Sequence, residues 1–294
     1  MTQVRYALLA SVLAGTVANC VYAQEARRAD RERLTQPVYK AERLEKPVDA
    51  AAGNVGPAQP ANLVHPLTPV IKLAKDAMAN MEANVQDYSA TLVKRERIGN
   101  TLGDPEYMFV KIRQKPFSVY TYFLSPEKKK GQEAIYVEGK NGGNIVGHGV
   151  GIQKMVGTVR LNPLSHFAMK DNRYPITEIG LFNLTNKLIE IGEKDMLKGE
   201  CEVKSAPGAK IKGRSCTFIE VVHPVPRRDF LFHKAVVYYD DELKIITRYE
   251  AYDWPAQAGG KPQLTEEYTY VDLKINNGFT DADFDENNPA YGYR

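Results

Sequence analysis

The clearest hydrophobic pattern in the chain lies between His223 and Pro255, where two runs rich in Val, Ile, Tyr and Phe flank a short Asp-Glu-Leu-Lys turn. The runs cover residues 230–240 and 245–254, and they predict a long antiparallel hairpin. Both runs carry apolar side chains on both faces, whereas a strand with one wet face should alternate apolar and polar residues. We therefore expect this hairpin in the middle of a large antiparallel sheet, with one face covered and the other lining a cavity.

Two other segments show the three- and four-residue spacing of apolar side chains that indicates helices. The first begins at Thr68, which we expect to be the N-cap, with Pro69 at the first helical position. The second is predicted over residues 178–194 with Thr177 as its cap, and its apolar residues form more than one stripe. We expect the first helix to pack one face on the sheet and the second to be buried on two sides.

The rest of the region is a succession of short strands separated by turns. The predicted strands cover residues 87–98, 106–113, 117–124, 132–138, 144–148, 155–161 and 264–275, with a further hairpin around Cys201 and Cys216. Residues 162–175 are predicted to be an irregular connection. This pattern predicts a single α+β domain over residues 63–294.

The first residues resemble a secretory leader. Arg5 is followed by an apolar run over residues 6–18 and by a small-x-Ala site ending at Ala23. We expect residues 1–23 to be a signal peptide cleaved after Ala23, and the protein to be exported to the periplasm or the extracellular space. The alternative is lipidation of Cys20, although Asn19 stands where lipoprotein signals carry Gly, Ala or Ser.

The segment after the leader has a different composition. Residues 24–62 mix Arg, Glu, Lys, Ala and Pro with very few bulky apolar side chains. Such a segment buries too little surface to offset its ordering entropy, so we predict a disordered polar linker. No segment after the leader approaches the roughly 20 apolar residues of a membrane span.

Two cysteines remain once the leader is removed, Cys201 and Cys216. In an oxidising compartment they are expected to form a disulfide across a hairpin, worth roughly 3 kcal/mol for a loop of this size. The alternative is two buried thiols. A zinc site is not expected, because neither cysteine has a CxxC partner.

Charge and motifs exclude several functions. The net charge is only +3, and the one basic cluster, Lys128 to Lys130, precedes a turn glycine, so we expect no nucleic-acid partner. There is no HExxH, GxSxG or GxxxxGK[ST] motif. We expect no metal, no cofactor and no catalytic residue, and a hydrolase using His223 or His233 is the third alternative.

Several short runs carry a resemblance to known families: KPFSVY, YVEGKN, NRYPITEIG and RYEAYDWP. Together they resemble an exported bacterial family known as a domain of unknown function and numbered 1571, over about residues 66–291. More loosely, the order of elements resembles the periplasmic lipoprotein-carrier superfamily. That resemblance implies an α+β fold with a curved, mostly antiparallel sheet (a half-open β-barrel) covered on its inner face by two helices.

The number of aromatic residues leads to the functional hypothesis. We expect an exported, non-enzymatic carrier or sensor that binds a lipid, an acyl chain or a lipoprotein in an apolar cavity between the sheet and the helices. The alternative is an envelope protein-protein interaction module without a small ligand. The aromatic residues expected at the cavity or its mouth are Tyr120, Tyr122, Phe182, Phe230, Phe232, Tyr238, Tyr252 and Trp254.

Overall fold

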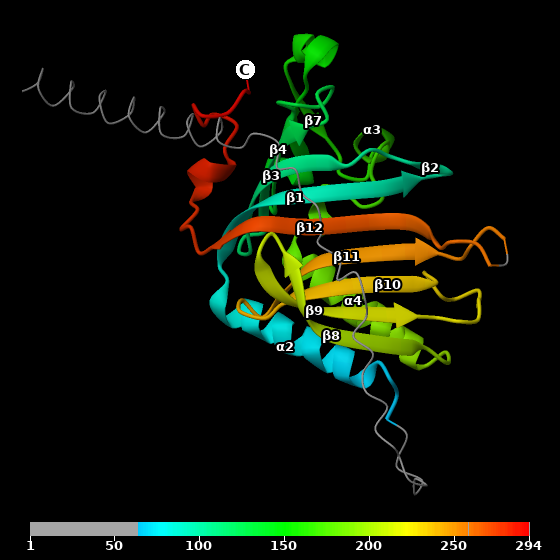
Figure 1. Cartoon of the computed structure of the whole chain (residues 1–294). Helices are drawn as coiled ribbons and strands as arrows, with labels where there is room; N and C mark the ends of the chain where they lie inside the picture. The colour runs from blue at the N-terminus through cyan, green and yellow to red at the C-terminus, as the bar shows by residue number, and fades with distance from the viewer. Residues whose placement is uncertain (1–63, 258, 294) are drawn as a thin grey trace, which may run out of the picture.

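The computed structural model describes residues 64–257 and 259–293, and these residues build one 12-stranded antiparallel sheet (Figure 1). Its strands are β1 (Asp87–Ile98), β2 (Thr101–Leu102), β3 (Glu106–Arg113), β4 (Ser118–Ser125), β5 (Glu133–Val137), β6 (Ile145–His148), β7 (Thr158–Leu161), β8 (Glu202–Ile211), β9 (Arg214–Val222), β10 (Lys234–Asp240), β11 (Ile245–Asp253) and β12 (Gln263–Ile275). Their order across the sheet is β7-β6-β5-β4-β3-β1-β12-β11-β10-β9-β8, and β2 pairs with β1. The predicted leader and linker lie outside the described residues.

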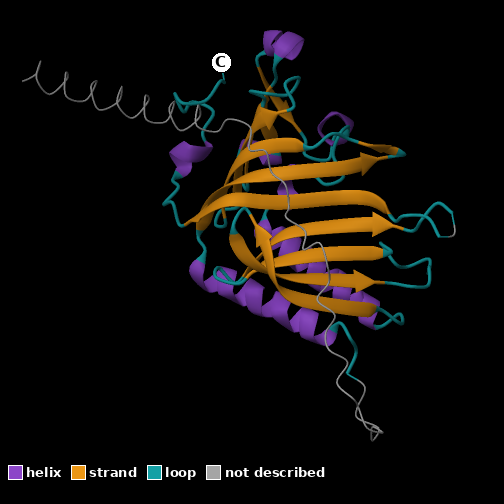
Figure 2. Cartoon of the chain, in the orientation of Figure 1, coloured by secondary structure: helices purple, strands orange, loops and turns teal. Residues whose placement is uncertain are grey.

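Two long helices cover one face of this sheet, and Figure 2 shows them on the same side. The helical segments are α2 (Thr68–Asn84), α3 (His166–Met169), α4 (Leu181–Met196) and the 3-10 turns η1 (Asn141–Gly143), η2 (Gly151–Val156), η3 (Ile176–Glu178) and η4 (Asp281–Phe284). The long helices α2 and α4 pack against each other and against β11. The predicted fold class is confirmed: the curved antiparallel sheet has two helices on its concave face. None of the helices in the described residues is both long and apolar enough to cross a membrane.

The two helix starts differ from their predictions. Leu67 rather than Thr68 occupies the N-cap of α2, and no side chain caps that end. The second helix starts at Leu181, because the polypeptide first makes the separate 3-10 turn η3 and then reaches Gly180 at φ 115°. The periodicity of apolar residues located both helices. It did not reveal the backbone break before α4, so the predicted start of that helix was three residues too early.

The predicted hairpin forms β10 and β11, which lie between β9 and β12. The first strand begins at Lys234 rather than Phe230, because residues 224–233 form a loop that rejoins the sheet through the His233 N–H donated to the Tyr252 carbonyl. The hairpin lies toward one side of the sheet, and the centre is formed by β1 with β3 and β12. Its concave face packs on the helices.

The main core lies between the helices and the strands on the β8 side of the sheet. Its buried members are Leu67, Ile71, Ala74, Cys201, Ile219, Val221, Phe232, Ala235, Val237, Ile246, Tyr249 and Ala251. A second core joins Met81 of α2 and Leu181 of α4 to the start of β1, the end of β3 and the start of β4. Apolar burial of this kind holds the helices to the sheet.

Residues 276–293, which we call the C-terminal segment, run across the convex face of β3 to β6. Asp87 holds the start of this segment by accepting the backbone N–H groups of Asn277, Gly278 and Phe279 at 2.6–3.0 Å. Further along, the Tyr291 ring stacks on Tyr120 with centroids 4.1 Å apart. The outer face of these strands is therefore covered, although neither long helix lies on that side.

The predicted disulfide is wrong. Cys201 and Cys216 are free, buried thiols. Cys216 lies opposite Ala209, whereas Cys201 precedes Glu202, which pairs with Val222 at the other end of the same hairpin. About seven residues of strand, roughly 23 Å, therefore separate the two cysteines along the hairpin, and a disulfide needs Cα atoms within about 7 Å. Burial raises the pKa of both thiols, that of Cys216 to about 11.

Candidate functional site

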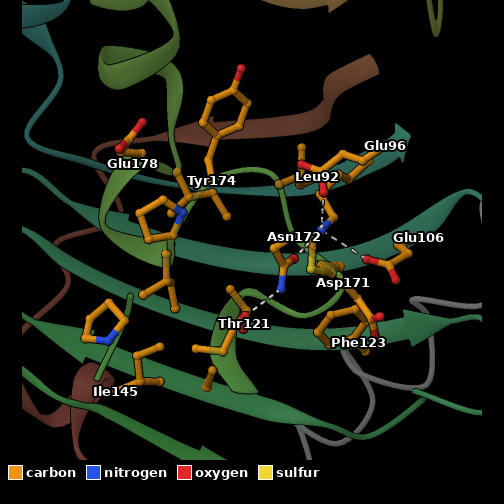
Figure 3. A pocket seen from close by; sticks show the side chains of 18 of the residues that line it. Leu92, Glu96, Glu106, Thr121, Phe123, Ile145, Asp171, Asn172, Tyr174 and Glu178 are labelled. Atoms are coloured by element: carbon orange, nitrogen blue, oxygen red, sulfur yellow. Dashed lines mark hydrogen bonds and ion pairs between the residues drawn. The ribbon is translucent and has the colours of Figure 1, made fainter. Parts of the chain in front are cut away.

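A large cavity opens between the concave face of the sheet and α4 (Figure 3). Its volume is about 1470 Å³, which is above the roughly 300–1,000 Å³ of pockets for drug-sized ligands. Strands β1, β3 to β7 and β12 form the floor. Helix α4 and residues 162–180, which we call the bridging segment, form the opposite wall. The cavity is therefore large enough for a long-chain ligand.

The strand register places an apolar row across the floor of this cavity. Leu92 of β1 lies opposite Met108 of β3 on one side and Tyr270 of β12 on the other. Phe123 of β4 lies opposite Met108 and extends the row. Further apolar lining residues come from β6, β7, the bridging segment and α4: Ile145, Val159, Leu161, Ile176, Ile179, Leu184, Leu188 and Ile191. This surface suits a hydrocarbon chain, which is stabilised in proportion to the apolar area it removes from water.

A polar row lies next to the apolar row, two residues further along β1. Lys94 is opposite Glu106 of β3 and Tyr268 of β12. The Lys94 Nζ lies 3.2 Å from Glu96 Oε2 and 3.3 Å from Glu106 Oε2. It also donates to Asn172 Oδ1 at 2.5 Å. Because Lys94 is only 7% exposed, its charge needs these partners.

The remaining contacts of the polar row involve the hydroxyl group of Tyr268. The Tyr268 hydroxyl donates to Glu96 Oε1 at 2.5 Å. Burial, together with the charges of Glu96 and Glu266, holds the pKa of Tyr268 far above its usual value. Tyr268 is therefore a neutral donor at physiological pH, and it completes the set of donors to Glu96.

The bridging segment is attached to the sheet mainly through Arg173. The Arg173 backbone N–H donates to Glu96 Oε2 at 3.1 Å, and its Nε donates to Glu266 Oε2 at 2.8 Å. Its guanidinium also donates to the Arg97 carbonyl at 3.1 Å. Burial raises the pKa of Glu266, and Arg173 opposes that shift. Charge-assisted bonds of this kind are about twice as strong as neutral ones, so this residue fixes one wall of the cavity.

Two buried tyrosines define where α4 begins. Tyr88 accepts the Leu181 N–H at 2.7 Å, and Tyr270 accepts the Gly180 N–H at 3.0 Å. Gly180 has φ 115°, and a Cβ there would lie 2.8 Å from the Tyr88 hydroxyl oxygen. Glycine at this position therefore allows the close approach that places α4 over the sheet.

None of the eight aromatic residues predicted at the cavity or its mouth is among the residues that line the cavity. Phe230 stacks on His223 with centroids 3.9 Å apart, and Phe232 belongs to the main core. Tyr238 and Tyr252 pack in a small cluster on the convex face with Val236 and Val271. The contact of these four residues with a ligand stays a prediction, since none of them is among the cavity-lining residues.

The other four aromatic residues also lie outside the cavity lining. Tyr120 and Tyr122 point to the convex face, where they pack with the C-terminal segment. Phe182 packs at the edge of the second core, and Trp254 lies 5.7 Å from the ring of His233. Side chains alternate along each strand, so one residue faces the cavity and its neighbour faces away from it. When a strand is apolar on both faces, its sequence does not show which of the two faces meets the cavity.

The polar row escaped prediction because its charged residues resemble a solvated strand end. Lys94 and Glu96 belong to the run Lys-Arg-Glu-Arg at the end of β1. Their spacing of two residues puts them on the face that carries Leu92. That spacing was the available signal, but burial depends on Glu106, Asn172 and Tyr268, which come from distant parts of the chain.

The histidines considered for catalysis do not face the cavity. His223 is completely buried, and its Nδ1 donates to the Phe232 carbonyl at 3.0 Å. Its Nε2 lies 3.4 Å from Asp195 Oδ2. Burial lowers the pKa of His223 and raises that of Asp195 to about 6. A single proton shared between His223 Nε2 and Asp195 Oδ2 allows a hydrogen bond between them. We interpret this pair as a buried structural contact between α4 and the β9–β10 loop. Across the described ranges, no three His, Cys, Asp or Glu side chains are grouped to hold a metal ion.

Fold and site together define a class of protein: an open antiparallel sheet whose concave face carries an apolar cavity beneath a helix. The chain belongs to the DUF1571 family, described as a protein of unknown function, whose model matches residues 85–293. The predicted membership is thus confirmed. No curated protein matches the sequence.

Three similar solved structures are remote in sequence. The lipoprotein LppX of Mycobacterium tuberculosis is 13% identical with a TM-score of 0.40, and the match covers 71% of this chain and 98% of that chain. An outer membrane lipoprotein-sorting protein domain of Vibrio parahaemolyticus is 13% identical with a TM-score of 0.35, covering 74% and 96%. A DUF1329 family protein of Desulfovibrio piger is 12% identical with a TM-score of 0.37, covering 76% and 98%. None of them assigns a ligand to this chain.

Proposed function

We propose that this protein is an exported, non-enzymatic carrier or sensor that binds a lipid or another long acyl chain in the cavity beneath α4. The observation that carries the proposal is the apolar row of Leu92, Met108 and Phe123, which faces a space of about 1470 Å³. A preformed apolar cavity of this size gains free energy when a hydrocarbon chain displaces water from its walls. Export follows from the leader-like first 23 residues, which remain a prediction.

The test is whether the protein carries lipid, and whether the lipid occupies this cavity. Protein purified from its own host is extracted and examined by mass spectrometry, and a fluorescent acyl probe is titrated into the delipidated protein. Leu161→Trp should fill part of the cavity and weaken probe binding by at least tenfold, about 1.4 kcal/mol. The matched control is Leu197→Trp, because Leu197 is 87% exposed and lies outside the lining.

Two results would contradict the proposal. One is a protein that never carries lipid and does not bind the probe. The other is equal loss of binding in Leu161→Trp and Leu197→Trp, which would place the probe outside the cavity.

A second candidate function is an envelope interaction module that binds another protein. Exposed apolar side chains near the cavity favour it: Met155 and Val156 in η2 are 88% and 71% exposed, and Leu164 and Phe167 around α3 are 72% and 64% exposed. Val156 and Phe167 also line the cavity. Affinity capture from envelope extract separates the two functions, because a stoichiometric protein partner without lipid supports the module and lipid without a partner supports the carrier.

A further inference from the structure

The polar row inside the cavity holds a hydrogen-bond acceptor that the protein itself leaves unused. Glu106 Oε2 is buried and receives no hydrogen bond from the described residues. The Lys94 ammonium lies 3.3 Å away and balances its charge, but Lys94 donates its hydrogen bonds to Glu96 and Asn172. The other oxygen of Glu106 already accepts from Lys129. Glu106 lines the cavity, so a rotation of its carboxyl group presents this oxygen to a donor supplied by a ligand.

The charges of the polar row are already balanced. Its cations are Lys94, Lys129 and Arg173, and its carboxylates are Glu96, Glu106 and Glu266. Asp171 also lies 3.7 Å from Lys129, but its side chain is 61% exposed, so solvent screens it. A charged ligand group placed here would therefore be desolvated without a free counter-ion.

The unused acceptor lies beside the apolar surface rather than apart from it. Glu106 and Met108 are alternate residues on the same face of β3, and both line the cavity. The register therefore puts Glu106 next to the row of Leu92, Met108 and Tyr270. An amphiphile whose chain covers that row brings its polar end to the Glu106 carboxylate.

We propose that the ligand of this cavity is an uncharged amphiphile of the acylglycerol or long-chain alcohol class, whose hydroxyl group donates to Glu106 Oε2. This inference rests on the proposed function, because it assumes that an acyl chain occupies the cavity. It adds that the polar end of the ligand lies inside the cavity against β3. Fatty acids and long-chain amines bind less well, since each brings a net charge to a balanced cluster.

The first experiment compares three C18 amphiphiles of identical chain, an alcohol, a carboxylate and an amine, at pH 7.5. Each displaces a fluorescent acyl probe from the wild-type protein. We expect the alcohol to bind at least tenfold more tightly than either charged ligand. Equal binding of all three would place the polar end in solvent and overturn the inference while the proposed function stands. If none of the three binds, the proposed function and the inference both fail.

The second experiment changes the net charge of the polar row by replacing Glu106 with glutamine, which has nearly the same shape. Glu106→Gln leaves one excess cation, so the affinity for the carboxylate should rise at least tenfold and the preference for the alcohol should be lost. Glu190→Gln is the control, because Glu190 also lines the cavity but is exposed on α4. An unchanged ligand preference in a folded Glu106→Gln protein would overturn the inference. The wild-type comparison decides the matter by itself if that variant does not fold.

Discussion

The concave face of the sheet is covered differently in its two halves. In the closed half, β8 to β11, helices α2 and α4 pack directly on the strands and leave a continuous apolar core. In the open half, β3 to β7, the concave face turns to the cavity, and the C-terminal segment covers the convex face instead. Strands β1 and β12 lie between the halves and take part in both.

The difference shows that a binding cavity can be made by the position of the covering layer rather than by a special strand sequence. Ile246 in the closed half and Leu161 in the open half are both aliphatic strand residues, and each faces the same side of the sheet. Ile246 is 2% exposed beneath the helices, whereas Leu161 is half-buried at the cavity wall. The following predictions test this comparison, from the largest expected effect to the smallest.

Truncation of the two aliphatic residues should separate stability from binding. Ile246→Ala leaves a hole in a packed core and should lower the free energy of unfolding by about 2–5 kcal/mol. Leu161→Ala should cost less than about 1 kcal/mol, because its side chain already borders open space, but it should weaken binding of an acyl probe. Urea denaturation and probe titration measure the two effects. Equal loss of stability in both variants would contradict the division into a closed and an open half.

The closed half also contains the buried pair of Asp195 and His223, and this predicts a pH dependence. The folded-state pKa of Asp195 is raised to about 6, above the roughly 3.9 of an unfolded chain. Because the folded protein keeps the Asp195 proton that the unfolded chain releases, the contribution of Asp195 to stability falls as pH rises from about 4 to 6, and that loss persists above pH 6. The lowered pKa of His223 acts in the opposite direction, because the unfolded histidine is protonated in this range and the buried one is not.

Asp195→Asn should remove this loss. The variant should be more stable than wild type at pH 7, by up to about 3 kcal/mol, and this difference should grow as pH rises from about 4 to 6. Thermal unfolding across that range measures the effect, with the exposed Glu190→Gln of α4 as control. A variant that is less stable than wild type at pH 7 would show that the ionised carboxylate stabilises the contact.

The open half depends on the C-terminal segment for its outer cover. Tyr291→Leu removes the ring that stacks on Tyr120 and the hydroxyl that donates to the Asp283 carbonyl at 2.6 Å. It should cost about 1–2 kcal/mol and increase hydrogen exchange in β4 and β5 more than in β10 and β11. Uniform exchange across all four strands would mean that the two halves do not open separately.

The smallest effect concerns the β8–β9 hairpin of the closed half. Because Cys201 and Cys216 are free and far apart, a reducing agent should leave the melting temperature unchanged. Alkylation of the unfolded protein, followed by mass spectrometry, should label both residues without prior reduction. A labelled fraction that appears only after reduction would show that the hairpin is cross-linked.

Prediction from sequence succeeded where local pattern is sufficient. The bounds of β1 and β3, residues 87–98 and 106–113, agree with the structure, and both long helices were located by their apolar spacing. The predicted space between the sheet and the second helix is also present, lined by Leu184, Leu188 and Ile191 of α4. Period-2 and period-3.6 patterns reflect burial along one element, so they are visible without knowledge of its neighbours.

What the sequence determined by itself is therefore the list of elements, the alternation of side chains along each strand and the membership in DUF1571. The tertiary structure alone decided which face of the hairpin β10–β11 meets the helices, how far apart Cys201 and Cys216 lie, and why Lys94 and Glu106 are buried. These outcomes depend on strand register and on the position of α4, which bring together residues far apart in the chain. The hairpin that dominates the hydrophobic pattern belongs to the closed half. The cavity lies in the other half of the sheet, where the helices do not pack directly on the strands.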